Sequence, residues 1–181
     1  MGTPKALLAY EGETFLDRLI GVLGSYCEPV VVVAGRHAGE IRAAAKRGQE
    51  VTFVENPDPD RGQLSSLQCA LGVMPASSDF LFLPVDFPSV REETIRTLAE
   101  RFTARGNDSL FVIPRYRGRR GHPVCADKKL AAEFLALPAN AEAREVVHKH
   151  RERTLYVDVD DPGVVTDVDT PEDYARLVGR G

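Results

Sequence analysis

The sequence predicts an α/β fold with an open, mostly parallel sheet flanked by helices. Two apolar runs, "VVVVAG" and "FLFLPVD", lack the alternation of a half-exposed strand, as expected for strands buried on both faces of a parallel sheet. Amphipathic segments separate such runs, in the order β, α, β, α, β, α, β. With right-handed crossovers this order gives a Rossmann-like sheet with helices on both faces.

The first half of the chain is expected to supply three of these units. Thr14 caps a helix whose apolar face carries Phe15, Leu16, Leu19, Ile20 and Leu23. The strand "VVVVAG" then leads to a short helix over "GEIRAAAKR", which Gly48 ends. The strand "VTFVEN" and a helix through "SSLQCALGVM" follow.

The second half continues the pattern and then loosens. After "FLFLPVD" a helix is predicted from Ser89 to about residue 104, with Ser89 and Glu92 as a capping box. The strands "SLFVIPRY" and "HPVCA", helices over 127–137 and 140–150, and the strand "TLYVDV" come next. A last helix is capped by Thr170 and has Pro171 at its first position.

Length and composition limit the class of protein. At 181 residues and 43% hydrophobic, the chain predicts one domain over residues 1–181. A net charge of −4 argues against a nucleic-acid partner. The three cysteines Cys27, Cys69 and Cys125 have no metal-like spacing and are expected to be reduced. Without a signal peptide or an apolar run of membrane length, the sequence predicts a cytoplasmic protein with no membrane partner.

Acidic side chains follow two predicted strands, where an open α/β sheet binds its ligands. Asp86 ends "FLFLPVD", and Asp167 and Asp169 precede the last helix. Carboxylates from distant segments suit Mg²⁺ when substrate phosphates supply the remaining ligands. The alternative is that these acids only end a strand and flank a helix start. Lys5, in the turn "MGTPK", adds a cation suited to phosphate and makes a phosphate site the preferred interpretation.

Two further stretches are candidate binding segments. "RGQLSSL" places Gly62, Ser65 and Ser66 where a helix start attracts anions or base edges, although Ser65 could simply cap that helix. "RYRGRRGHP" is either an arginine clamp for a small anionic substrate or a solvated turn.

Other candidates are weaker. His148 and His150 are a poor metal pair, and Asp158, Asp160 and Asp161 are expected in solvent. Neither a P-loop nor a dinucleotide-binding glycine motif is present.

Five stretches together resemble the MobA-like nucleotidyltransferases, and among them the molybdenum cofactor cytidylyltransferases. They are "MGTPKALL", "ENPDPDRGQLSSLQCAL", "LPVDFP", "RYRGRRGHPV" and "DVDTPEDY", in the family's order. The resemblance implies a single Rossmann-like domain of the nucleotide-diphospho-sugar transferase type. It also implies Mg²⁺-dependent transfer of a nucleoside monophosphate from a triphosphate to a phosphorylated acceptor, with release of pyrophosphate. Mn²⁺ is an alternative metal.

The resemblance assigns roles residue by residue. Lys5 would hold the triphosphate, and Asp86 and Asp169, with Asp167 as a weaker candidate, would hold the metal. Lys5 and Asp86 would be the catalytic residues. Asn56, Gly62, Ser65 and Ser66 would line the nucleotide pocket with Lys5 and Asp86. Arg119, Arg120, Gly121 and His122 would face the acceptor.

The resemblance also suggests partners. "GQLSSL" favours CTP over GTP, the acceptor would be of the molybdopterin type, and a molybdoenzyme or its maturation factor could receive the product. Two alternatives stay open. One is guanylyl transfer, or transfer to a sugar phosphate or an isoprenoid precursor. The other is a non-catalytic relative that binds without transferring.

In the family, "MGxPK" closes a signature that opens with a strand and a loop reading like "LAAGxSxR". The sequence therefore predicts that the strand expected in mid-sheet and its phosphate-cradling loop are missing, through a misplaced start or a truncation. Neighbouring strands would then have unpaired backbone groups unless another segment fills the gap.

Overall fold

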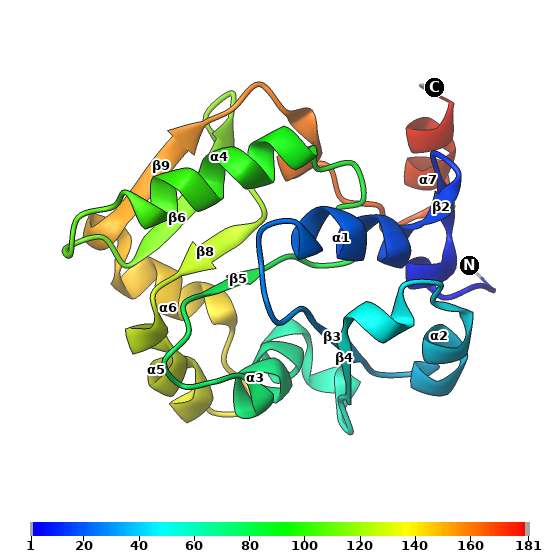
Figure 1. Cartoon of the computed structure of the whole chain (residues 1–181), viewed down its shortest axis with the longest axis horizontal. Coiled ribbons are helices and arrows are strands. Elements are labelled where there is room, and N and C mark those ends of the chain that lie inside the picture. The colour runs from blue at the N-terminus through cyan, green and yellow to red at the C-terminus, as the bar shows by residue number, and fades with distance from the viewer. Residues whose placement is uncertain (1, 180–181) are drawn as a thin grey trace.

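The computed structural model describes residues 2–179, so Met1 of the "MGTPK" turn lies outside the described part (Figure 1). The strands are β1 (Ala9–Tyr10), β2 (Glu13–Thr14), β3 (Val31–Ala34), β4 (Thr52–Glu55), β5 (Phe80–Phe82), β6 (Phe111–Tyr116), β7 (Arg119–Arg120), β8 (Val124–Ala126) and β9 (Thr154–Asp158). The α-helices are α1 (Phe15–Gly24), α2 (Ala38–Ala44), α3 (Gln63–Val73), α4 (Glu92–Thr103), α5 (Ala131–Ala136), α6 (Ala143–Lys149) and α7 (Pro171–Val178).

The main sheet has five strands in the order β5-β8-β6-β7, with β9 paired to β6. Strand β8 is antiparallel to both β5 and β6, so β5 and β6 run in the same direction, and β9 is parallel to β6. Strand β8, the predicted "HPVCA" strand, therefore interrupts the parallel set. The predicted α/β fold with a mostly parallel sheet is confirmed.

Strands β3 and β4 form a separate parallel pair, and no strand of residues 2–179 joins this pair to the main sheet. In Figure 1 the pair lies below α1, away from β6 and β9 at the upper left. The prediction that "VVVVAG" is buried on both faces is wrong, because Val31, Val32 and Val33 are only half-buried. Within residues 2–179, no strand pairs with the second edge of β3.

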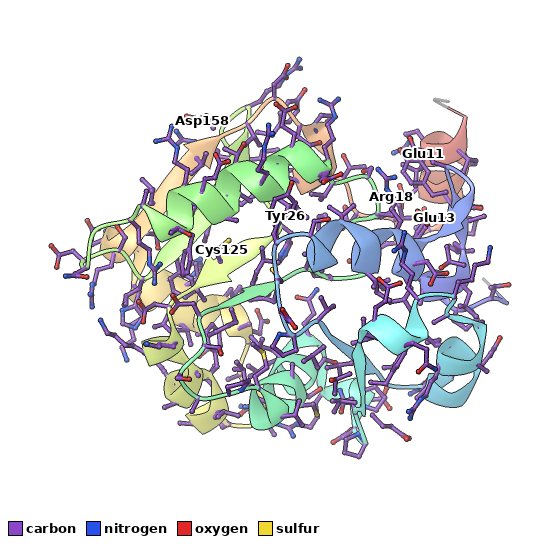
Figure 2. All side chains as sticks on the ribbon, viewed as in Figure 1. Glu11, Glu13, Arg18, Tyr26, Cys125 and Asp158 are labelled. Atoms are coloured by element: carbon purple, nitrogen blue, oxygen red, sulfur yellow. The ribbon has the colours of Figure 1, made fainter. Side chains whose placement is uncertain are left out.

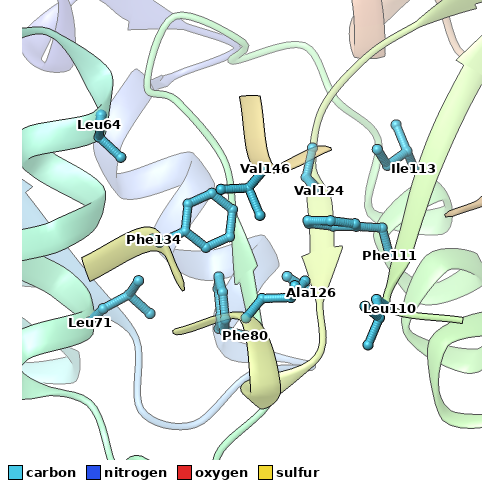
Figure 3. Close-up of a cluster of buried hydrophobic side chains, with 11 residues drawn as sticks. Leu64, Leu71, Phe80, Leu110, Phe111, Ile113, Val124, Ala126, Phe134 and Val146 are labelled. Atoms are coloured by element: carbon cyan, nitrogen blue, oxygen red, sulfur yellow. The ribbon is translucent and has the colours of Figure 1, made fainter. Parts of the chain in front are cut away.

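The largest apolar cluster lies between the main sheet and helices α3, α5 and α6 (Figure 3). Phe134 of α5 stands at its centre and meets Phe80 and Phe111 edge to face, at 6.0 and 6.4 Å between ring centroids. Such aromatic contacts, with the area they bury, hold the helices on this face of the sheet. The α5 segment is thereby fixed behind β5, the strand that leads to Asp86.

Helix α4 begins at Glu92, three residues after the predicted start, and its N-cap residue is Arg91. The predicted capping box of Ser89 and Glu92 is wrong because Asp161 caps the helix from outside. Its Oδ2 accepts hydrogen bonds from the Arg91 backbone N–H at 2.9 Å and from Thr94 Oγ1 at 2.7 Å. Asp161 is 2% exposed, which also corrects the expectation that it is solvated.

The other helix starts follow the sequence more closely. Thr14 caps α1, and Thr170 caps α7 in a capping box with Asp173. Helix α3 begins earlier than predicted, at Gln63, with Gly62 as its N-cap residue at φ +81°, so the cap is not Ser65. No helix within residues 2–179 combines the length and apolarity needed to cross a bilayer.

Candidate functional site

Asp86 follows β5 and lies where three segments come together: the one after β5, the one before α7 and the Lys5–Leu7 turn. The backbone carbonyl of Asp86 accepts a hydrogen bond from the Val168 N–H at 2.9 Å, which fixes Asp167 and Asp169 beside it. Asp86 Oδ1 is buried and has no hydrogen-bond partner within residues 2–179. Burial raises the pKa of Asp86, the positive charge of Lys5 lowers it, and the negative charges of Asp169 and Asp167 raise it further.

Lys5 reaches the same point from the start of the chain. It begins a short 3₁₀ turn, Lys5–Leu7, that Pro4 precedes. The Lys5 ammonium lies 2.5 Å from Asp169 Oδ1, and its side chain is 32% exposed. The capping box of α7 fixes the backbone of Asp169, whose N–H donates to Asp173 Oδ2 at 3.3 Å. The structure therefore brings together Lys5, Asp86 and Asp169 as the sequence predicts.

The carboxylates at this point suit a hard divalent ion only with help from a ligand. Within residues 2–179 no three His, Cys, Asp or Glu side chains are grouped closely enough to hold a metal by themselves. Carboxylate oxygens are the donors that Mg²⁺ and Mn²⁺ accept, and substrate phosphates and waters commonly complete such sites. The orphaned Oδ1 of Asp86 is a free acceptor of this kind.

The predicted nucleotide residues form a second group, after β4. Asn56 is buried and donates from Nδ2 to Ser65 Oγ at 2.8 Å and to Ser66 Oγ at 3.0 Å. Its Oδ1 accepts from the Asp58 N–H, and Ser65 Oγ donates to the Gly62 carbonyl at 2.8 Å. Asn56 and Ser65 thus tie the 56–62 loop to the first turn of α3. The polar groups of these two side chains therefore bond within the loop and to the start of α3, and they stabilise the shape of the loop.

The predicted acceptor residues divide between two places. Arg119 and Arg120 lie exposed on β7 of an edge hairpin, with the Arg120 guanidinium 4.8 Å from the Tyr156 ring centroid. Within the described residues neither arginine forms an ion pair. In the described part of the chain, neither arginine forms a hydrogen bond or an ion pair with Lys5, Asp86 or Asp169.

His122 lies nearer to that group. Its ring is 4.8 Å, centroid to centroid, from the ring of Phe87, the residue after Asp86. Burial lowers the pKa of His122 to about 4, against a smaller opposing effect of Asp167, so the imidazole is neutral near pH 7. The buried His122 Nδ1 has no partner within residues 2–179. Gly121 before it packs against the Val164 carbonyl, where no side chain fits.

A cavity of about 620 Å³ connects the two groups, since Lys5 and Asp86 line it together with Ser66 and Gln63. Gln63 and Phe87 are additions to the residues that the sequence singled out. Gln63 is the first residue of α3, so its position next to Gly62 is the signal that points to it. Phe87 could be found only through its contact with His122.

Comparison with known proteins identifies the family of this chain. The MobA-like NTP transferase domain matches residues 1–154. The molybdenum cofactor cytidylyltransferase of Escherichia coli (strain K12) is 24% identical over 180 residues, which are 99% of this chain and 90% of that relative. A molybdenum cofactor guanylyltransferase of Sinorhizobium fredii is 32% identical over 88 residues, 49% of this chain and 40% of that protein.

A solved structure gives the same result over the whole chain. The crystal structure of Rv0371c from Mycobacterium tuberculosis H37Rv superposes with a TM-score of 0.78 at 29% identity, covering 99% of this chain and 91% of that one. Its complex with manganese gives a TM-score of 0.76 at 30% identity, with 98% and 92% covered. The chain belongs to the MobA-like NTP transferase family and is a nucleotidyltransferase of that family.

Proposed function

We propose that this protein transfers CMP from CTP to a phosphorylated acceptor of the molybdopterin type and releases pyrophosphate, with Mg²⁺ as the metal. It would act in molybdenum cofactor biosynthesis, and a molybdoenzyme or its maturation factor would receive the product. The observation that carries the proposal is Asp86. A half-buried carboxylate with an orphaned oxygen, next to a lysine and two further acids, is suited to a cation and a polyphosphate.

The residues have separate tasks in this reaction. Asp86 and Asp169, with Asp167 beside them, would hold the divalent ion, which when bound supplies charge neutralisation to the phosphates. Mn²⁺ could replace Mg²⁺. Lys5 would hold the triphosphate, exchanging its ion pair with Asp169 for phosphate oxygens. An acceptor phosphate oxygen attacks the α-phosphorus in line, and pyrophosphate leaves. The protein contributes position and charge.

The nucleotide would bind in the part of the cavity that Lys5, Ser66 and Asp86 line. Asn56, Gly62 and Ser65 would set the shape of the base site from the loop before α3, and Ser66 would line it. CTP is preferred over GTP because of the "GQLSSL" motif and the full-length match to a cytidylyltransferase. The match to a guanylyltransferase keeps GTP as the necessary control.

The acceptor would lie between His122 and the β7 arginines. Arg119→Ala and Arg120→Ala should weaken acceptor binding and leave CTP binding unchanged, as measured by the KM for each substrate. An equal loss for both substrates would argue against the acceptor-side placement. Gly121 keeps the His122 backbone against Val164, whose carbonyl accepts the His122 N–H at 2.8 Å.

The decisive test compares Asp86→Asn with Asp158→Asn. Asp158 is an exposed acid at the end of β9 that pairs with Arg115 of β6. Figure 2 shows Asp158 at the outer edge of the sheet. Mn²⁺ binding, followed by electron paramagnetic resonance in the presence of CTP, should be lost in the first variant and kept in the second. Pyrophosphate release should follow the same pattern. Normal Mg²⁺-dependent turnover by Asp86→Asn would contradict the assignment of Asp86 as a metal ligand.

The second candidate is a non-catalytic binding protein, and the division of the sheet between β3 and β5 favours it. Thermal unfolding in Mg²⁺ with CTP, GTP or neither first measures whether the chain binds a nucleotide, and a turnover assay then separates the two candidates. A ligand at 100 times its dissociation constant stabilises the folded state by about 2.7 kcal/mol, which a midpoint shift reports. A shift with CTP but no turnover on any phosphorylated acceptor would favour the binding protein.

A further inference from the structure

Strand β9 forms the outer edge of the main sheet. Within residues 2–179 it pairs with β6 along one side and with no strand along the other. Its contact with β6 extends past both ends of the strand. The Arg153 carbonyl accepts the Leu110 N–H at 2.8 Å, and the Val159 N–H donates to the Arg115 carbonyl at 3.0 Å. Figure 1 shows β9 at the outer left of the molecule.

This edge leaves a row of backbone groups without a partner. In a parallel ladder the N–H and C=O groups of successive residues alternate between the two sides of the strand. Because Arg153 and Val159 both bond toward β6, Thr154, Tyr156 and Asp158 direct their N–H and C=O groups to the open side. In the described chain no other backbone hydrogen bond uses these groups. An open edge of this kind is a template for pairing with another strand.

The side chains along this edge are suited to a second copy of the same strand. Val157 packs against Leu98 and Phe102 of α4, so Leu155 and Val159, two residues away on either side, lie on the same face of the sheet. The outward backbone groups of one copy can bond only to the outward groups of the other, so these apolar residues lie opposite one another in the pair. The pairing therefore covers Leu155, which is 38% exposed.

Charges at the two ends of β9 favour an antiparallel arrangement of the copies. Arg151 and Arg153 precede the strand, Asp158 and Asp160 come at its end, and all four are exposed. Parallel copies would place like charges side by side, whereas antiparallel copies bring the arginines of one protomer toward the aspartates of its partner. A two-fold axis relates such copies, so the assembly closes at two protomers.

We infer that β9 is the contact surface of a homodimer, formed by antiparallel pairing of β9 with β9 of a second copy of this chain. The five-stranded sheet of one protomer then continues into that of its partner, by the strand addition used in peptide recognition. The contact involves one strand on each side and is small, so the dimer dissociates on dilution. No nucleotide, metal or acceptor takes part, and the inference does not depend on the proposed function.

Sedimentation velocity of the full chain, without nucleotide or metal, measures the assembly. It should show monomer at low micromolar protein and dimer toward the millimolar range. Residue-resolved amide hydrogen exchange by NMR then identifies the surface. The Tyr156 and Asp158 amides should exchange roughly tenfold more slowly in the dimer, while the Leu155 and Val157 amides, which already bond to β6, should change less. A chain that stays monomeric, or a dimer in which the Tyr156 and Asp158 amides gain no protection, would overturn the inference.

A matched pair of substitutions locates the contact. Leu155 of β9 and Val178 of α7 are 38% and 46% exposed, so each offers an apolar side chain open to solvent. Leu155→Lys should raise the dissociation constant of the dimer roughly tenfold or more, because it places a charge between the two apolar rows, and Val178→Lys should leave it unchanged. Urea unfolding at a concentration where both variants are monomeric checks that Leu155→Lys keeps the fold. Equal dissociation constants for the two variants would contradict the inference, and these outcomes are independent of the Mn²⁺ test at Asp86.

Discussion

Lys5 and Asp169 are 164 positions apart in the sequence, and the Lys5 ammonium lies 2.5 Å from Asp169 Oδ1. The contact joins the turn before β1 to the segment before α7. Asp86, in the segment after β5, lies beside this contact. Both side chains are partly exposed, at 32% and 58%, so the pair contributes little to stability. Its significance is positional, because it holds a cation beside the orphaned oxygen of Asp86.

Lys5→Met should reduce nucleotidyl transfer roughly 100-fold, the usual cost of removing one donor that stabilises developing charge. The CTP dissociation constant, from calorimetry in Mg²⁺, should rise as well. Lys46→Met is the control, because Lys46 is exposed and outside the site. Unchanged CTP affinity and turnover in Lys5→Met would remove Lys5 from the nucleotide site.

His122 should make the stability of the protein depend on pH between its ordinary pKa and its lowered one. Burial lowers the pKa of His122 from 6.5 to about 4, so in this window the unfolded chain binds a proton that the folded chain excludes. The free energy of unfolding should therefore decrease as the pH falls from 6.5 to 4, by roughly 2 to 3 kcal/mol from this residue.

Urea unfolding of wild type and His122→Leu at several pH values measures this contribution. The difference between the two proteins should change across the window, because leucine keeps the packing on Phe87 and does not titrate. A flat difference for His122→Leu would mean that the imidazole titrates normally.

Gly121→Ala should be strongly destabilising, by several kcal/mol, because a Cβ there would overlap the Val164 carbonyl in the backbone of the 162–165 turn. Gly72→Ala on α3 is the matched control. No atom lies within 4 Å of a Cβ at Gly72, and alanine in a helix interior is favoured by about 1 kcal/mol. Thermal midpoints should therefore move in opposite directions for the two variants. A midpoint for Gly121→Ala equal to wild type would show that the turn relaxes freely.

Asp161→Ala should lower the free energy of unfolding by about 1 to 2 kcal/mol, the cost of losing a helix cap. The variant removes the acceptor of Arg91 N–H and Thr94 Oγ1 at the start of α4. Asp160→Ala, next to it and exposed, should change stability by less than about 0.5 kcal/mol. Chemical denaturation distinguishes the two, and equal losses would place the cap elsewhere.

Local patterns predicted much of the fold because they act over a few residues. The capping sequence of the last helix and the cap at Thr14 are confirmed, since a side-chain oxygen and an N–H three residues away meet without help from the rest of the chain. The same reasoning failed at Ser89. The competing acceptor, Asp161, lies 70 residues after Arg91, the N-cap residue of α4, and is brought in by tertiary packing.

The candidate site was predicted in part for a related reason. Asp86, Asp167 and Asp169 could be expected together because the chain leaves a strand or enters a helix at each of them, and the Val168–Asp86 backbone bond joins the two segments. The roles of Asn56 and Ser65 in fixing the loop, and the tilted contact between the rings of His122 and Phe87, follow from contacts that no local spacing reports.

The sequence by itself determined the α/β class, most helix and strand positions, and the acids and lysine of the candidate site. These follow from periodicity, capping and turn chemistry, which are encoded over short distances. Only the tertiary structure decided that β3 and β5 belong to separate sheets, that Asp161 is buried under α4, and that His122 is neutral. Each of these depends on which distant segments exclude water from a group, and burial of this kind is a property of the packed chain.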